Sequence, residues 1–307
     1  MPFTRHGTRW ELELARPAAD RLEYLLELED GRGEIRLVPD PGNPLEADGP
    51  FGPKSVVEFP GYESPAWVGD EESAPGELRE VALPGRLGVT ALLWSAAEVD
   101  PGEPLPLLLV HDGPEYAEYC SLLRLFDHLV AFGELPPFSA VLLPPPADRN
   151  ETYSGSARYA RALVTDWLPA LEPYEGRPAG LGASLGALAW LHVHWTYPGA
   201  LAGLFLQSGS FFRRRLDPQE AGAQRFARIT RFVSRVFGSR GTVERIPVVL
   251  TCGSVEENLA NNRAVASALR RQGWQAPLVE HPDAHNWISW RDSLHPQLAE
   301  LMLRAVT

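Results

Sequence analysis

A serine between two glycines is the first candidate for chemistry in this chain. Residues 182–186 read Gly-Ala-Ser-Leu-Gly, between an apolar run that ends at Gly182 and an apolar helical stretch that begins at Leu185. Only small residues fit beside the serine when a strand turns this sharply into a helix. Such a turn presents the serine at the carboxyl end of the strand. The pattern therefore predicts that Ser184 is a nucleophile.

Two later residues follow in the order that a serine nucleophile of this kind needs. Glu256 and His285 each come directly after a later apolar run, the acid first and the histidine second. A histidine can take the serine proton and return it to the leaving group, while a carboxylate fixes the imidazole tautomer. We therefore predict Ser184, Glu256 and His285 as the catalytic residues.

Alternatives remain open for the acid and for the base. Glu257 is adjacent to Glu256, and either carboxylate could simply complement the N-terminus of the helix that follows. Asp283 lies two residues before His285 and is a third candidate for the acid. His281 competes with His285 as the base, but it still belongs to the preceding apolar run.

From residue 78 onward, short apolar runs alternate with longer amphipathic stretches. The apolar runs cover residues 78–83, 89–94, 106–113, 139–146, 178–184, 203–210, 246–254 and 276–281. The helical stretches cover residues 115–132, 157–171, 185–196, 223–237, 257–272 and 289–304. Strands that alternate with helices form a mostly parallel sheet with helices on both faces. The sequence thus predicts an α/β catalytic domain at residues 77–307.

The first 76 residues show a different pattern of apolar and polar residues. Apolar and charged residues alternate in residues 9–14, 22–31 and 34–38, which predicts antiparallel strands. Residues 39–65 are rich in proline and glycine and read as irregular. The acidic stretch 68–77 has no apolar period, and we interpret it as a linker. We expect residues 1–76 to form a small β-rich region of their own.

Composition and charge exclude several classes of function. The 307 residues include 28 basic and 40 acidic side chains, a formal net charge of −12, which disfavours binding to nucleic acid. Cys120 and Cys252 form no zinc motif, and we expect neither a metal nor a cofactor. Since no segment resembles a signal peptide or a membrane span, we expect a cytoplasmic protein without a membrane partner. The sequence leaves open whether the chain assembles into a homo-oligomer.

Five motifs in the same order resemble the enterochelin-esterase-like branch of the α/β-hydrolases. They occupy residues 107–116, 147–153, 180–211, 252–274 and 281–294. The resemblance implies an α/β-hydrolase fold and carboxylic-ester hydrolysis, with Ser184 as nucleophile, His285 as base and Glu256 as acid. Residues 40–44 and 55–67 are similar to the β-sandwich domain that precedes the hydrolase in enterochelin esterases, in shortened form.

An oxyanion hole in such an enzyme needs two backbone amides. One comes from the residue after the serine, Leu185, and the other from the turn after the strand at residues 106–113. In related enzymes the second donor often follows the Asp-Gly pair, but here that position is Pro114, which has no N–H. Three interpretations stay open: the amide of Gly113 or Glu115 supplies the second donor, the enzyme is slow, or the protein is not an enzyme.

Several side chains are candidates for substrate contacts. Tyr116, Trp287 and Trp290 could form an aromatic wall for a ring-bearing acyl group, or could simply pack under the loops. Arg149 follows a strand end and either meets an anionic substrate or pairs with a neighbouring acid. The resemblance implies a small-molecule ester as the substrate, with siderophore, feruloyl, acetyl-sugar and aryl esters as the classes. An acyltransferase of the same fold and a non-catalytic binding module are the alternatives.

Overall fold

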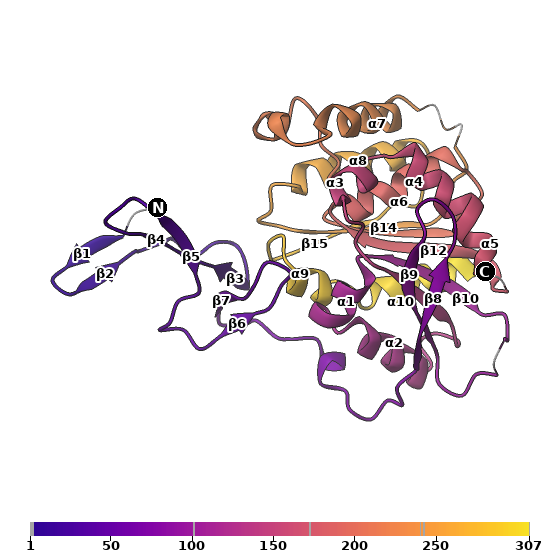
Figure 1. Cartoon of the computed structure of the whole chain (residues 1–307), viewed down its shortest axis with the longest axis horizontal. Helices are drawn as coiled ribbons and strands as arrows, with labels where there is room; N and C mark the ends of the chain where they lie inside the picture. Colours follow the sequence, from indigo (N-terminus) through magenta and orange to yellow (C-terminus); the bar gives the residue numbers. More distant parts are fainter. Residues whose placement is uncertain (1–2, 101, 172, 240, 242, 307) are drawn as a thin grey trace.

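A computed structural model of the chain describes residues 3–100, 102–171, 173–239, 241 and 243–306, and Figure 1 shows the whole chain. Its centre is an eight-stranded sheet in the order β15-β14-β13-β12-β10-β11-β9-β8. The strands are β8 (Glu77–Leu83), β9 (Val89–Ser95), β10 (Pro106–His111), β11 (Ser139–Leu143), β12 (Glu175–Ala183), β13 (Gly203–Gln207), β14 (Val248–Gly253) and β15 (Leu278–His281). The six strands from β10 to β15 run parallel, and β8 and β9 are antiparallel at one edge. The predicted α/β-hydrolase fold is confirmed.

Alternate residues of the central strands pack on opposite faces of the sheet. On β10, Leu107 and Leu109 contact the core beneath one helical layer, while Leu108 and Val110 contact the other. The first layer contains α4 (Ala157–Ala162), α6 (Leu185–Thr196), α7 (Phe226–Gly238) and α8 (Leu259–Arg271). The second contains α1 (Gly113–Tyr119), α2 (Leu122–Ala131), α9 (Trp287–Asp292) and α10 (Gln297–Val306). Burial on both faces explains why these strands read as continuous apolar runs.

Three predicted helices are interrupted. The stretch 115–132 divides into α1 and α2 because Ser121 has a left-handed backbone, with φ of 51°. The stretch 289–304 divides into α9 and α10 before Pro296, which cannot donate a helical hydrogen bond. The stretch 157–171 contains a π-helical turn just before Pro169. The remaining helices are η1 (Ala66–Gly69), α3 (Arg149–Tyr153), η2 (Leu163–Trp167), α5 (Leu168–Ala170) and η3 (Pro218–Gly222).

The N-terminal region consists of small antiparallel sheets. β1 (Thr4–His6) pairs with β2 (Arg9–Glu11), β4 (Leu26–Glu29) pairs with β5 (Ile35–Val38), and β7 (Lys54–Glu58) lies between β3 (Arg21–Tyr24) and β6 (Glu46–Ala47). The run 22–31 is therefore divided between two sheets, and the stretch expected to be irregular, 39–65, holds β6 and β7. Figure 1 shows the β1–β2 and β4–β5 hairpins projecting away from the main body.

The N-terminal region reaches the catalytic sheet near the predicted histidine. The Asp20 amide donates to the Pro282 carbonyl at 2.7 Å, and the Ser254 hydroxyl donates to the Ala18 carbonyl at 3.2 Å. The acidic stretch 68–77 is also attached to the body, because the Gly76 amide donates to the carboxylate of Asp127 on α2. The two predicted domains therefore contact each other, and the boundary at residue 76 stays a prediction.

Candidate active site

The turn from β12 into α6 has the tight geometry that the sequence predicts. Ser184 lies between the two elements with φ of 55° and ψ of −120°, a conformation that is uncommon for a residue with a side chain. A Cβ atom added to Gly182 would lie 2.9 Å from the carbonyl carbon of Gly186. A Cβ atom added to Gly186 would lie 3.2 Å from the Cβ of His111. The glycines beside Ser184 thus allow the helix to begin against the end of the sheet.

The structure brings Glu256 and His285 together. Nδ1 of His285 lies 2.8 Å from Oε2 of Glu256, and the carboxyl is almost completely buried. Because a carboxylate only accepts, Nδ1 carries the proton and Nε2 is left able to accept another. Burial alone would raise the pKa of the Glu256 carboxyl, but the hydrogen bonds that it accepts, first from His285, lower it below its usual value.

A further set of hydrogen bonds fixes the Glu256 carboxyl. Its Oε1 accepts from the hydroxyl of Ser208 and from the amide of Gly253, both at 2.6 Å. The Ser208 hydroxyl in turn accepts from the indole N–H of Trp290 at 3.0 Å. The other two candidate acids have different surroundings: Glu257 is exposed, and Asp283 accepts from the amides of Ala284 and Asn286. Glu256 is therefore the carboxylate placed to orient the imidazole.

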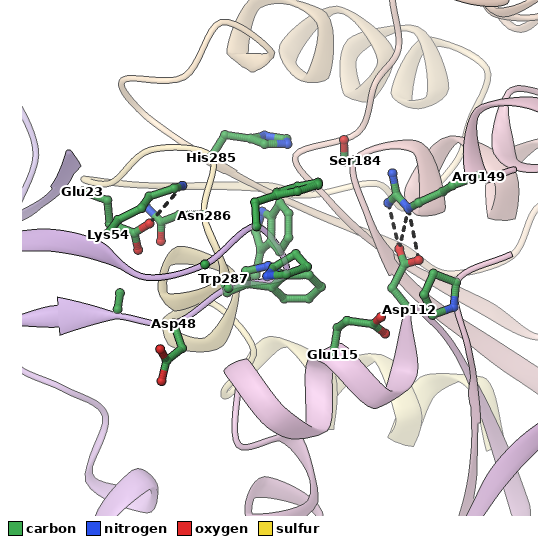
Figure 2. Close-up of a pocket in the computed structure, with 17 residues that line it drawn as sticks. Glu23, Asp48, Lys54, Asp112, Glu115, Arg149, Ser184, His285, Asn286 and Trp287 are labelled. Carbon is green, nitrogen blue, oxygen red and sulfur yellow. Dashed lines mark hydrogen bonds and ion pairs between the residues drawn. The ribbon is translucent and has the colours of Figure 1, made fainter. Parts of the chain in front are cut away.

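The Ser184 hydroxyl and the His285 ring meet at one opening. Figure 2 shows the imidazole directed toward Ser184 from across the pocket. The hydroxyl lies 3.1 Å from that of Ser210, and in the described part of the chain no hydrogen bond joins Ser184 to His285. In structures without substrate, a catalytic hydrogen bond of this kind is often not yet formed and becomes aligned when substrate binds.

Two of the predicted oxyanion amides lie at adjacent helix ends. Leu185 is the first residue of α6, Gly113 is the first residue of α1, and the strands before them, β12 and β10, are neighbours. The first amides of a helix have no carbonyl partner within it. Pro114 occupies the first turn of α1, where a missing N–H breaks no helical hydrogen bond. Glu115 is the third residue of α1, so Gly113 is the predicted donor at the first position of this helix.

A cavity of about 410 Å³ opens in front of Ser184 and His285. The catalytic domain supplies Asp112, Glu115, Pro145, Arg149, Ser184, His285, Asn286, Trp287 and Trp290 to its lining. The N-terminal region supplies Glu23, residues 47–52 and Lys54. The cavity is thus built from both parts of the chain, and Figure 2 shows Lys54 and Arg149 on opposite sides of it.

The candidate substrate residues divide into two groups. Trp287, Trp290 and Arg149 line the cavity, whereas Tyr116 does not: it is fully buried, and its hydroxyl donates to Gln207 at 2.7 Å. The expected contact of Tyr116 with substrate is therefore wrong, because this ring packs edge-on beneath Trp287, with the ring centroids 5.4 Å apart.

Arg149 pairs with an acid that the sequence did not suggest. Its guanidinium makes three hydrogen bonds to the carboxylate of Asp112, at 2.7, 3.1 and 3.2 Å. Coulombic attraction and hydrogen bonding to this carboxylate raise the pKa of Arg149, although burial opposes them as the largest single effect. Asp112 itself has a left-handed backbone, with φ of 52°, between β10 and α1. Arg149 therefore holds this turn in place and is not a free anion site.

Sequence reasoning missed two sets of site residues. Ser208 and Ser210 follow β13 at the same sheet edge as Ser184, so their position at a strand end was an available signal. Phe51 and Lys54 come from the N-terminal region, and no local pattern indicates that this region reaches the cavity.

No group of three or more His, Cys, Asp or Glu side chains in the described ranges could hold a metal ion. No helix within those ranges is long and apolar enough to cross a membrane.

Known structures share this fold. The enterobactin esterase of Shigella flexneri, solved in the presence of enterobactin, has a TM-score of 0.70 and 22% identity, covering 87% of this chain and 69% of that chain. Ferric enterobactin esterase of Salmonella typhimurium has a TM-score of 0.65 and 22% identity, covering 87% and 68%. A ferulic acid esterase has a TM-score of 0.62 and 17% identity, covering 75% and 99%.

No protein-family model matches the chain, and no curated protein sequence matches it. At these identities the structural likeness concerns the fold. The chain therefore has an α/β-hydrolase fold that is similar to the folds of enterobactin and ferulic acid esterases.

Proposed function

We propose that this protein is a serine hydrolase of carboxylic esters that acts on a small-molecule ester through an acyl-enzyme. The observation that carries the proposal is the hydrogen bond between the buried Glu256 carboxyl and the imidazole of His285, which faces Ser184 across one cavity. The fold supports it, since the similar structures named above are esterases.

The proposed reaction begins at the Ser184 hydroxyl. Nε2 of His285 takes the hydroxyl proton as the serine oxygen bonds to the ester carbonyl carbon, and the carbonyl oxygen becomes an oxyanion. The amides of Leu185 and Gly113 would hold this oxyanion, because both lie at helix ends beside the serine. His285 then gives its proton to the leaving alcohol, and the acyl group remains on Ser184.

Water completes the cycle. His285 takes a proton from the water as the water oxygen attacks the acyl carbon, and returns a proton to Ser184 as the carboxylic acid leaves. The Glu256 carboxylate stays ionised throughout and stabilises the imidazolium that forms twice. Its three hydrogen-bond donors, from His285, Ser208 and Gly253, are suited to that role because they keep the carboxyl charged in a buried place.

The position of Pro114 bears on the non-catalytic alternative, because a proline without an N–H at this turn could remove one oxyanion donor. This proline lies in the first turn of α1, and Gly113 beside it still carries an amide at the helix end. The geometry therefore does not require the loss of an oxyanion donor that the sequence suggested.

Ester hydrolysis can be tested with 4-nitrophenyl esters of increasing acyl length and with aryl acyl groups, comparing wild type with Ser184→Ala. We expect the wild type to hydrolyse a subset of short or ring-bearing esters, and Ser184→Ala to lose at least about 10³-fold in kcat. Equal rates for the two folded proteins on every ester would contradict the proposal. Adding an alcohol acceptor and measuring ester as well as free acid distinguishes hydrolysis from acyl transfer.

A further inference from the structure

Most charged side chains around the cavity already have partners. Arg149 is held by Asp112, as described above. On the far side, Glu23 accepts from Arg21 at 2.8 Å and from Lys54 at 3.3 Å. Neither cation that lines the cavity is therefore left free for an anionic ligand.

Two acidic side chains of the lining, Glu115 and Asp48, form no ion pair among the described residues, and Glu115 lies at the end of the cavity near Ser184. Its Oε2 atom is buried and has no hydrogen-bond partner among the described residues. Together with the Asp112–Arg149 pair, Glu115 leaves this end of the cavity with one net negative charge. In Figure 2 its carboxyl extends into the space between Trp287 and Asp112. Burial, the largest effect, and the neighbouring Asp112 charge raise the pKa of the Glu115 carboxyl. A bound cation would offset both effects.

Aromatic rings line the cavity beside this carboxyl. Trp287 and Trp290 meet at 79° with their centroids 4.8 Å apart, so that they form a corner. Phe51, from the N-terminal region, also lines the cavity and has an almost fully exposed side chain. Aromatic rings beside a carboxylate are a setting that binds alkylammonium groups, because the negative ring faces and the charge of the acid both attract the cation.

We propose that this cavity binds an alkylammonium group, so that the ester acted on carries a trimethylammonium-type cation in its alcohol or its acyl part. The cation would lie between the Glu115 carboxylate and the tryptophan corner, within the cavity that contains Ser184. This inference rests on the proposed function and names its substrate class. It also explains why the acidic residue at the start of α1 points into the cavity rather than to solvent.

Binding can be measured without catalysis on the Ser184→Ala variant. The probes are choline and 3,3-dimethylbutan-1-ol, which have the same shape and differ in charge, and the method is calorimetric titration. We expect choline to bind at least about tenfold more tightly than the neutral alcohol. Adding Glu115→Gln should abolish this preference. Adding Glu118→Gln, an exposed acid on the same helix that does not line the cavity, should preserve it. Equal binding of the two probes, or no binding of choline, overturns the inference.

The same charge comparison applies to turnover. Acetyl esters of choline and 3,3-dimethylbutan-1-ol place the charge in the alcohol, and 4-nitrophenyl esters of 4-(trimethylammonio)butyrate and 5,5-dimethylhexanoate place it in the acyl part. We expect the cationic member of at least one pair to have a kcat/KM at least about tenfold higher, with the ratio reduced by Glu115→Gln. Hydrolysis of both members at equal rates in both pairs contradicts only this inference. Choline binding without cleavage of any ester contradicts only the proposed function.

Discussion

At the scale of single residues, the sequence predicted three side chains that lie far apart in the chain and that the structure places close together. Ser184, Glu256 and His285 are separated by 72 and 29 positions, yet His285 bonds Glu256 and lines the same cavity as Ser184. Their positions after strands were readable because the carboxyl ends of parallel strands meet at the same edge. The hydrogen-bond partners of the site residues could not be predicted from the sequence. Whether the Ser208 hydroxyl bonds Glu256, or Arg149 bonds Asp112, depends on side-chain directions that no spacing specifies.

Glu256→Gln tests the role of the buried carboxyl. The glutamine carbonyl can still accept from Ser208 and Gly253, but its amide would face Nδ1 of His285. The proton would then move to Nε2, and the ring could no longer accept the serine proton. We expect kcat to fall by about 10³ to 10⁴-fold with little change in thermal stability. Glu257→Gln, at an exposed neighbour, should stay within about twofold of wild type; similar losses in both variants would argue against the assigned acid.

Asp283 gives a prediction for stability against pH. Burial, opposed in part by its hydrogen bonds, raises the pKa of this carboxyl from 3.8 to about 6. Between these values the folded state binds more protons than the unfolded state. The free energy of unfolding therefore falls as the pH rises from about 4 to about 6. Asp283→Asn can retain both hydrogen bonds, because Ala284 and Asn286 donate to the same oxygen.

We therefore expect Asp283→Asn to be more stable than wild type by about 2 kcal/mol at pH 8, with a difference near zero at pH 3.5. Urea unfolding at the two pH values measures this. A stability difference of the same size at pH 8 and at pH 3.5 would show that the charge of the Asp283 carboxyl does not cause it.

At the scale of elements, strands β10 to β14 were predictable because burial on both faces gives each a short apolar run, whereas β8, β9 and β15 are more exposed. The helices were less predictable. Ser121 interrupts one amphipathic pattern through its left-handed backbone, although the predicted stretch 115–132 contains no proline or glycine. The N-terminal strands β6 and β7 were hidden within a proline-rich stretch, since a sheet of two to five residues per strand leaves little periodic signal.

The turn before α6 depends on the close approach of Gly182 and Gly186. An added methyl group at Gly182 would meet the Gly186 carbonyl carbon at 2.9 Å and the Trp190 ring at 3.1 Å. We expect Gly182→Ala to lower the free energy of unfolding by about 2–3 kcal/mol and to reduce kcat, because the helix must move away from the strand. Gly238→Ala is the matched control, since nothing lies within 4 Å of its added methyl group. Equal stability of the two variants would contradict the packing argument.

At the scale of the whole molecule, the cavity joins two parts of the chain that the sequence treats as separate. The Asp20 amide donates to the Pro282 carbonyl, and residues 47–52 line the cavity opposite the catalytic domain. A contact between segments more than 200 positions apart has no local pattern, and this is why the N-terminal side of the cavity could not be predicted. The catalytic residues could be predicted because they all follow strands within one domain.

Phe51→Ala tests whether the N-terminal region takes part in binding. The Phe51 side chain is 99% exposed, so its loss should leave the melting temperature within about 1 °C. Because it lines the cavity, we expect KM for aryl esters to rise severalfold while kcat changes little. Trp10→Ala removes another exposed aromatic ring that does not line the cavity, and it should change neither constant. Unchanged KM in Phe51→Ala would mean that the N-terminal region does not contact the substrate.

The most direct test of the central claim is covalent labelling with a fluorophosphonate, followed by peptide mass spectrometry. This reagent reacts with a serine whose proton is taken by a neighbouring base, so it reports on the activated nucleophile without requiring knowledge of the ester. The account predicts one adduct per chain, on Ser184, which is absent in Ser184→Ala and formed much more slowly in Glu256→Gln. A folded wild-type protein that takes no label, or takes it on Ser210, would contradict the account.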